Sequence, residues 1–196
     1  MKFDIYIASV GGLGALTTSV IIARAADLQG YYVKGFQLHG LAQRSGSTVA
    51  MVRIGSEKEV KSSIIDKADL IISFEPLETL KALNYATKKT SAIMNTYKII
   101  PAYSYIENIP YPELGKLVSE VKKYVANVYA INAYQISREN FGNIIYGNLI
   151  ILGYAIAKKL LPLKKQHVIK AIKQTVKYNI DKNLEALEFG FKLAQQ

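Results

Sequence analysis

The sequence predicts a single α/β domain over residues 1–196, with three α/β/α layers, a mostly parallel, Rossmann-like sheet and a helical C-terminal third. Two observations favour this fold class. The chain opens with a strand, a glycine turn, a helix and a second strand, which is the unit of a parallel α/β sheet. Short apolar strands and helical patterns then alternate, and only helical patterns follow them. A chain of 196 residues suits one domain, and no linker is long enough to divide it.

The opening unit begins with Phe3–Ser9, a short apolar run predicted to be a buried strand, and Val10–Gly14 follows as a tight turn. The next residues have the spacing of one face of a helix at i, i+3, i+7 and i+10, namely Leu13, Leu16, Val20 and Ala23. Gly30 ends this helix, because glycine is the commonest residue just past a helix end. Tyr31–Gln37 is the second predicted strand.

The middle of the chain adds strands and helices in alternation. Leu38–Ser47 is polar and punctuated by glycine, which predicts a loop. The strands expected after it are Thr48–Ile54, Ala68–Phe74, Ser91–Asn95 and Val128–Ala133. Helices are expected over Leu77–Lys88 and over an amphipathic segment marked by Leu114, Leu117, Val118, Val121 and Val125. Pro101–Pro112 is rich in proline and tyrosine and is predicted to be an exposed connection.

The C-terminal third is predicted to be helical over Asn143–Leu161, Lys164–Asn179 and Asn183–Leu193. Pro162 separates the first two helices, because proline cannot continue a helix. The first of them is the most apolar stretch of the chain, but glycines, an asparagine and two lysines interrupt it. A buried core helix is therefore expected rather than a membrane span. The N-terminus does not look like a signal peptide, and the protein is expected to be cytoplasmic.

The composition limits the chemistry that this chain can carry. It has no cysteine, so neither a disulfide nor a thiolate ligand for an iron–sulfur cluster or a structural zinc is possible. Its only histidines are His39 and His167, which predict no metal site, and no set of catalytic residues is apparent. The net charge of +10 is concentrated in the lysines of the C-terminal third. It fits a solvated basic face, an anionic ligand or an acidic partner; nucleic acid is disfavoured, because no aromatic residues are interleaved with the lysines.

The first candidate site is the turn that contains Gly11, Gly12 and Gly14. Glycines allow the backbone to turn sharply and to approach a ligand, and the helix behind them offers free N–H groups to a phosphate. The alternative interpretation is a tight turn that serves packing alone. A dinucleotide site of the usual kind is less favoured, because Thr17 stands where the third glycine belongs and no acidic residue closes the second strand.

The second candidate site is the loop from His39 to Ser47, which also contains Gln43, Arg44 and Ser45. The guanidinium of Arg44 could hold a carboxylate or a phosphate through two parallel hydrogen bonds. The alternative is a solvated crossover in which the arginine is incidental. If the loop is functional, it should lie at the carboxyl ends of the strands, where α/β sheets bind their ligands.

Taken together, these segments resemble the gamma-type domain of 2-oxoacid:ferredoxin oxidoreductases, which includes the small (beta) subunit of indolepyruvate oxidoreductase and the gamma subunit of pyruvate oxidoreductase. The resemblance is carried by Gly11–Gly14, by the string His39-Gly40-Leu41-Ala42-Gln43-Arg44-Ser45-Gly46-Ser47, and by Val52–Gly55, Ala68–Leu70, Phe74–Pro76, Asn148–Gly153 and Asn183–Gly190. It covers nearly the whole chain, and the string is its specific part. Leu13 stands where the family usually has glutamine, and Ser45 where it has glycine.

The resemblance implies a non-redox subunit of a complex of the indolepyruvate or pyruvate kind, which decarboxylates a 2-oxoacid oxidatively to an acyl-CoA. In this family thiamine diphosphate and the iron–sulfur clusters that feed ferredoxin belong to other subunits or domains. The chain would bind no cofactor by itself and would be inactive alone. Beside a large thiamine- and cluster-containing subunit it would complete the active site and help to seat CoA. A stand-alone nucleotide- or anion-binding module is the alternative, with no nucleic acid or membrane as partner.

Overall fold

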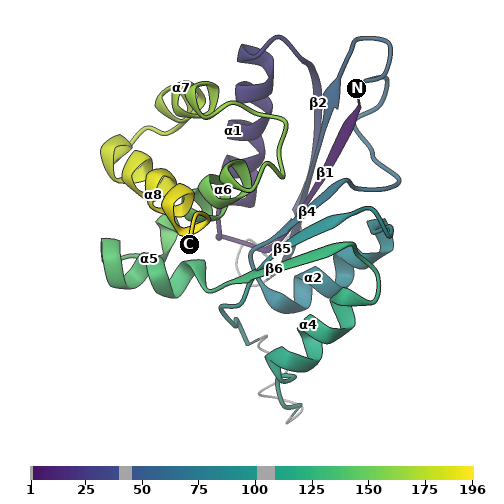
Figure 1. Cartoon of the computed structure of the whole chain (residues 1–196), viewed down its shortest axis with the longest axis vertical. Helices are drawn as coiled ribbons and strands as arrows, with labels where there is room; N and C mark the ends of the chain where they lie inside the picture. The colour runs from purple at the N-terminus through teal and green to yellow at the C-terminus, as the bar shows by residue number, and fades with distance from the viewer. Residues whose placement is uncertain (1, 40–45, 101–108) are drawn as a thin grey trace.

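The computed structural model describes residues 2–39, 46–100 and 109–196, which form a six-stranded sheet between layers of helices (Figure 1). The strands are β1 (Phe3–Val10), β2 (Tyr32–His39), β3 (Ser47–Gly55), β4 (Leu70–Ser73), β5 (Ser91–Asn95) and β6 (Asn127–Ile131). Their order in the sheet is β2-β3-β1-β4-β5-β6. This confirms the predicted α/β fold class.

The sheet is mostly parallel, with one reversed strand. β1, β4, β5 and β6 pair in parallel, whereas β3 is antiparallel to both of its neighbours, β1 and β2. The opening strand–helix–strand unit therefore does not place β2 beside β1, because β3 lies between them. In this register Ser47 faces Val10, so the start of β3 lies beside the end of β1.

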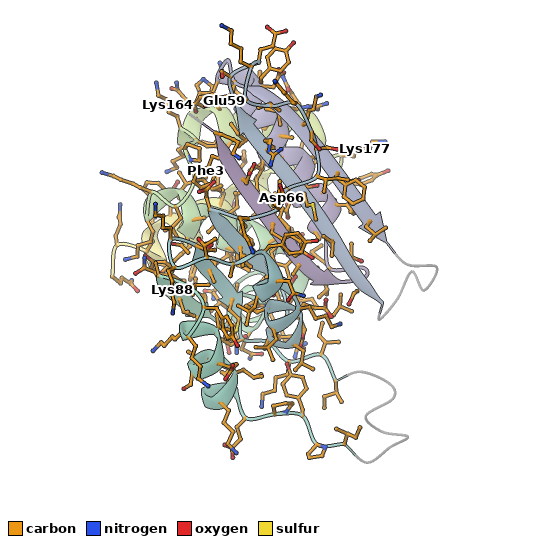
Figure 2. All side chains as sticks on the ribbon, turned by 90° about the vertical axis from the view of Figure 1, so that its right-hand side faces the viewer. Phe3, Glu59, Asp66, Lys88, Lys164 and Lys177 are labelled. Carbon is orange, nitrogen blue, oxygen red and sulfur yellow. The ribbon has the colours of Figure 1, made fainter. Side chains whose placement is uncertain are left out.

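One face of the sheet is covered by α1 (Ala15–Leu28) and by helices from the C-terminal third, α6 (Gly147–Ala157), α7 (Lys165–Thr175) and α8 (Ile180–Leu193), with α5 (Ala133–Phe141) at one end (Figure 1). The other face is covered by α2 (Pro76–Ala82), the single turn η1 (Leu83–Tyr85) and α4 (Leu114–Lys122). A second single turn, η2 (Ile144–Tyr146), joins α5 to α6 on the first face. A separate apolar core lies on each face. The connection from β3 to β4, where Glu59 and Asp66 are labelled, crosses the face opposite α1 (Figure 2).

Helix α6 is buried almost all round, as expected for a core helix. Gly153 and Gly190 let its backbone approach that of α8: an added Cβ at Gly190 would lie 1.9 Å from the carbonyl oxygen of Ile150. Among the described residues, no helix is both long enough and apolar enough to cross a membrane.

Several predicted boundaries were wrong. The predicted helix over Asn143–Leu161 consists of the turn η2 and the helix α6, which ends at Ala157. The last strand ends at Ile131, and Ala133 begins helix α5, which was not predicted; Asn132 caps it by accepting a hydrogen bond from the Gln135 N–H at 3.3 Å. The predicted helix over Leu77–Lys88 ends at Ala82 and continues only as the turn η1. Helix α7 ends at Thr175 rather than at Asn179, which has a positive φ of 51°. The predicted connection Pro101–Pro112 lies mostly outside the described residues.

Candidate functional site

The glycine turn lies at the carboxyl edge of the sheet, at the point where the chain changes direction. After β1 the chain passes through α1 towards β2, on one side of the sheet, and after β4 it passes through α2 towards β5, on the other side. Open α/β sheets bind ligands in the crevice that such a change of direction creates. Residues 11–14 follow β1 at this edge, and Glu75 follows the neighbouring strand β4.

Two glycines of the turn are required for different physical reasons. Gly12 and Gly14 both have a positive φ, of 89° and 79°, which favours glycine over residues with a Cβ. An added Cβ at Gly14 would lie 2.2 Å from Asn148 Nδ2, so the close approach expected of this glycine is made by a side chain of α6. An added Cβ at Gly12 would meet nothing within 4 Å, so this glycine faces open space.

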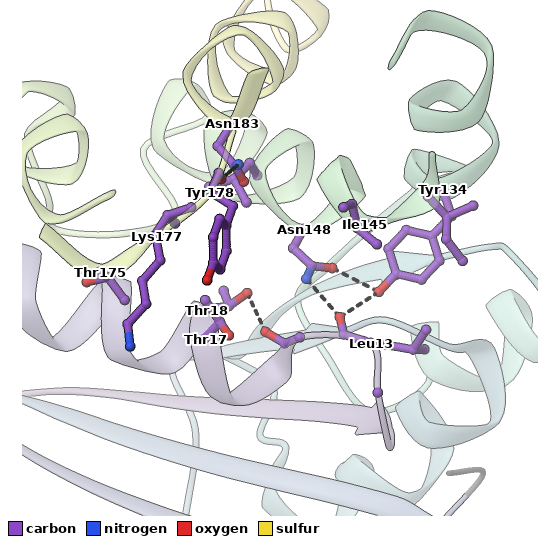
Figure 3. A pocket seen from close by; sticks show the side chains of 15 residues that line it. Leu13, Thr17, Thr18, Tyr134, Ile145, Asn148, Thr175, Lys177, Tyr178 and Asn183 are labelled. Atoms are coloured by element: carbon purple, nitrogen blue, oxygen red, sulfur yellow. Dashed lines mark hydrogen bonds between the residues drawn. The ribbon is translucent and has the colours of Figure 1, made fainter. Parts of the chain in front are cut away.

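Two buried polar side chains, one from α5 and one from α6, form hydrogen bonds with the backbone of the turn. Asn148 Nδ2 donates to the Leu13 carbonyl oxygen at 2.7 Å, and Tyr134 Oη lies 3.2 Å from the same oxygen and 2.9 Å from Asn148 Oδ1 (Figure 3). Burial raises the pKa of the Tyr134 hydroxyl well above its ordinary value, so the hydroxyl keeps its proton and remains a donor. The residue before β3 also contacts the turn, since Gly11 N–H donates to the Gly46 carbonyl at 2.7 Å.

A cavity of about 360 Å³ adjoins the turn, between the start of α1, η2, α6 and the connection from α7 to α8 (Figure 3). Its lining combines apolar side chains with hydroxyl, amide and ammonium groups, contributed by Gly12, Leu13, Gly14, Thr17, Thr18, Tyr134, Ile144, Ile145, Asn148, Leu149, Thr175, Val176, Lys177, Tyr178 and Asn183. The ring of Tyr178 is 80% exposed, and Lys177 is exposed beside it. The cavity therefore offers apolar walls and a cationic side chain next to the glycine turn.

Helix α1 begins without a side-chain cap, because its N-cap residue is Gly14. The first N–H groups of a helix have no partner within the helix, and the helix dipole makes this end favourable for an anion. Among the described residues there is no cluster of His, Asp or Glu that could hold a metal ion. The uncapped start of α1 is thus suited to holding an anionic ligand.

The neighbouring part of the edge is occupied by buried carboxylates with structural partners. Glu75 caps α2, since its Oε2 accepts from Leu77 N–H at 2.7 Å and Glu78 N–H at 3.1 Å, and its Oε1 accepts from Tyr111 Oη at 2.5 Å. Glu75 is thus the N-cap residue of α2. Lys81 Nζ donates to Glu78 Oε1 at 2.6 Å and to Ser47 Oγ at 2.7 Å, and Ser47 Oγ donates to the Glu78 carboxylate.

The structure places part of the predicted site. Gly12 and Gly14 line the cavity, Gly11 contacts Gly46, and Ser47 lies at the edge beside the end of β1. The backbone of His39 ends β2, whereas Gln43, Arg44 and Ser45 lie outside the described residues. Four residues of the site were missed: Tyr134, Asn148, Lys177 and Tyr178. The amide of Asn148 within an apolar helical run was the one signal that could have revealed it.

Comparisons with known proteins agree with this fold. Residues 4–193 match the family "Pyruvate ferredoxin/flavodoxin oxidoreductase". The chain is 39% identical, over 99% of its length and 96% of the relative's, to the indolepyruvate oxidoreductase subunit IorB of Archaeoglobus fulgidus. It is 29% identical, over 94% and 93% of the two lengths, to the common gamma subunit of the pyruvate/ketoisovalerate oxidoreductases of Pyrococcus abyssi.

Solved structures show the same fold at low sequence identity. A pyruvate oxidoreductase subunit from Thermotoga maritima superposes with a TM-score of 0.71 at 21% identity, covering 97% of this chain and 96% of that one. A 2-oxoglutarate:ferredoxin oxidoreductase from Magnetococcus marinus, solved with 2-oxoglutarate, coenzyme A and succinyl-CoA bound, gives a TM-score of 0.76 at 19% identity. The match covers 99% of this chain and 31% of that chain, so there the fold is one part of a longer polypeptide.

Proposed function

The chain belongs to the pyruvate ferredoxin/flavodoxin oxidoreductase family, and we propose that it is the small, non-redox subunit of a cytoplasmic 2-oxoacid:ferredoxin oxidoreductase of the indolepyruvate or pyruvate kind. Such a complex decarboxylates a 2-oxoacid oxidatively, forms an acyl-CoA and passes the electrons to ferredoxin. Relatives that match almost end to end are named as subunits of these enzymes, which supports a role inside a complex.

The division of labour that we propose assigns thiamine diphosphate and the iron–sulfur clusters to a large partner subunit. The composition of this chain supports that assignment, because clusters are held by cysteine thiolates and this chain has none. Its own contribution would be to complete the active site of the partner and to bind CoA, which carries a pyrophosphate and a further phosphate.

The observation that carries the CoA proposal is the open side of Gly12 at the uncapped start of α1. A phosphate can approach the backbone there, because an added Cβ at Gly12 would meet nothing within 4 Å, and the helix end favours negative charge. The adjoining cavity of about 360 Å³, with Lys177 in its lining, could receive a further part of an extended anionic ligand.

The function is tested by co-expression with the large subunit, followed by assays with pyruvate, branched-chain, aryl and 2-oxoglutarate substrates. We expect ferredoxin reduction by the complex and none by the isolated chain, which should be colourless when purified without oxygen. Stoichiometric iron, or decarboxylase activity, in the isolated chain would refute the proposed division of labour.

The proposed CoA-binding site at the glycine turn is tested by Gly12→Asp, which adds a side chain and a negative charge on the open side of the turn. In the assembled complex the KM for CoA should rise about 10-fold or more, which corresponds to the loss of one charge-assisted contact. The KM for the 2-oxoacid should change much less. An equal loss for both substrates would indicate faulty folding or assembly instead.

A stand-alone nucleotide- or anion-binding module is the second candidate, because the turn and the cavity both lie within this chain. The two functions differ in a simple observation. A subunit should co-purify with its large partner at a fixed ratio, whereas a stand-alone module should remain free and bind its ligand with unchanged affinity in the absence of the partner.

A further inference from the structure

We propose that Asn148, supported by Tyr134, is a positioning residue that orients the peptide between Leu13 and Gly14, so that the Gly14 N–H is presented to the ligand. The proposal rests on the proposed function, because it takes CoA, or its phosphate groups, to be the ligand of the glycine turn. In this proposal, two residues of the C-terminal half determine the conformation of a turn near the N-terminus.

The first step is the orientation of the Asn148 amide. The Leu13 carbonyl oxygen can only accept hydrogen bonds, so the atom of Asn148 that lies 2.7 Å from it must be the donor nitrogen. The amide oxygen of Asn148 then accepts a hydrogen bond from Tyr134 Oη at 2.9 Å. Tyr134 thereby fixes the side chain of Asn148, and Asn148 in turn fixes the carbonyl of Leu13.

The second step follows from the planarity of the peptide bond. In a trans peptide the C=O and the N–H point in opposite directions, and the described chain contains no cis peptide. Because the Leu13 carbonyl points towards α6, the Gly14 N–H must point away from α6. Among the described residues no hydrogen bond occupies this N–H. The reversed peptide would present a carbonyl oxygen, which repels an anion.

The third step is the fit between the amide and the turn. Asn148 and Tyr134 are 6% and 1% exposed, so both act from the interior. An added Cβ at Gly14 would lie 2.2 Å from Asn148 Nδ2, and an added Cβ at Gly147 would lie 2.2 Å from Tyr134 Cδ1. Two glycines thus make room for the two polar side chains, which leaves the peptide little freedom to turn over.

The test uses the complex with the large subunit and measures the steady-state kinetics for CoA and for the 2-oxoacid separately. Asn148→Leu has nearly the same shape and no hydrogen-bonding group, and Asn148→Asp keeps the shape but loses the donor. Both should raise the KM for CoA about 10-fold, with kcat and the KM for the 2-oxoacid changed less than about two-fold. Tyr134→Phe keeps the contact between Asn148 and Leu13, so it should have a smaller effect in the same direction.

Ser137→Ala is the matched control. It removes another buried hydrogen bond of α5, from Ser137 Oγ to the Asn143 carbonyl at 2.5 Å, without contacting the turn. It should leave the KM for CoA unchanged. The positioning role is wrong if both Asn148 variants shift the two KM values equally. It is also wrong if they leave the KM for CoA unchanged while Gly12→Asp raises it, and in that case the proposed CoA-binding site at the turn still stands. If Gly12→Asp also has no effect on the KM for CoA, the proposed CoA-binding site itself is wrong.

Discussion

Arg53 and Asp4 form a two-pronged ion pair across neighbouring strands at the centre of the sheet. Arg53 Nε lies 2.7 Å from Asp4 Oδ1 and Arg53 Nη2 lies 3.0 Å from Asp4 Oδ2, at paired positions of β3 and β1. Their side chains are 10% and 4% exposed. The hydrogen bonds to Asp4 raise the pKa of Arg53, so its guanidinium stays charged. The pair therefore holds the one reversed strand against β1.

Breaking this pair should be costly. Arg53→Met leaves the buried Asp4 carboxylate with only the half-exposed Lys2, 3.5 Å away, as an ion-pair partner, and the free energy of unfolding should fall by about 2–4 kcal/mol. Replacing both residues, as in Asp4→Leu with Arg53→Met, should recover most of the loss. Guanidinium chloride unfolding of the three chains measures these changes. A loss below about 1 kcal/mol for the single variant would show that the pair does not stabilise the sheet.

Two glycine substitutions should have opposite effects on stability, because only one of them lies where α6 and α8 are in close contact. In Gly190→Ala the new methyl group would overlap the backbone of Ile150, so the helices must separate, at a cost of about 1–3 kcal/mol. In Gly115→Ala, on the exposed side of α4, nothing lies within 4 Å, and stability should rise by about 0.5–1 kcal/mol. Thermal unfolding decides the matter, and a loss of stability in both variants would contradict the packing argument.

Glu75 predicts a pH dependence of stability. Burial raises the pKa of its carboxyl, against the opposing effect of hydrogen bonds from Tyr111 and from backbone N–H groups. In the unfolded chain the group loses its proton at a lower pH, so the folded state binds more protons between the two pKa values. Stability should therefore fall as the pH rises through this window and level off above it.

Glu75→Gln cannot ionise, and it should become more stable relative to the wild type as the pH rises from about 4 to 7. Urea unfolding at several pH values gives the difference between the two chains. Parallel curves for the two would show that Glu75 does not titrate differently on folding. Glu113→Gln, at a largely exposed carboxylate, is the matched control.

Arg44 is the residue of the His39–Ser47 loop that we expect to matter most, and it stays a prediction because it lies outside the described residues. Of the described residues that flank the loop, Gly46 contacts the glycine turn, since its carbonyl accepts from Gly11 N–H. Arg44→Ala should lower turnover or assembly of the complex, and Arg44→Lys should do so too, because lysine lacks the planar fork. Unchanged assembly and turnover in Arg44→Ala would remove the loop from the site.

Local patterns predicted most of the elements but not the way in which they are assembled. The loop Leu38–Ser47 is too short for a crossover between parallel strands, so the antiparallel pairing of β2 with β3 could have been predicted from its length. That β3 inserts between β2 and β1 depends on long-range pairing, as in the contact of Val10 with Ser47, which no local pattern encodes. Helix α5 was missed because only Ala133, Tyr134 and Ser137 of it are buried, and one of these three is polar.

The candidate site was predicted in the same partial way. The glycine turn at Gly12 and Gly14 was predicted, since a turn between a strand and a helix has a local signature, whereas its role in binding stays a prediction. The reason given for Gly14 was incomplete, because the side chain that needs its lack of a Cβ belongs to α6. The roles of Asn148 and Tyr134 depend on the tertiary fold, which alone brings them to Leu13.

The hydrogen bond between Asn148 and Leu13 joins residues that are 135 positions apart in the chain. Ribosomes add residues one at a time from the N-terminus, so the turn at residues 11–14 is made long before its anchor emerges. A nascent chain released before α6 would carry every glycine of the turn and yet lack the contact that fixes its peptide. If the turn binds a ligand as we propose, the growing chain would gain that ability only after α6 has been synthesised.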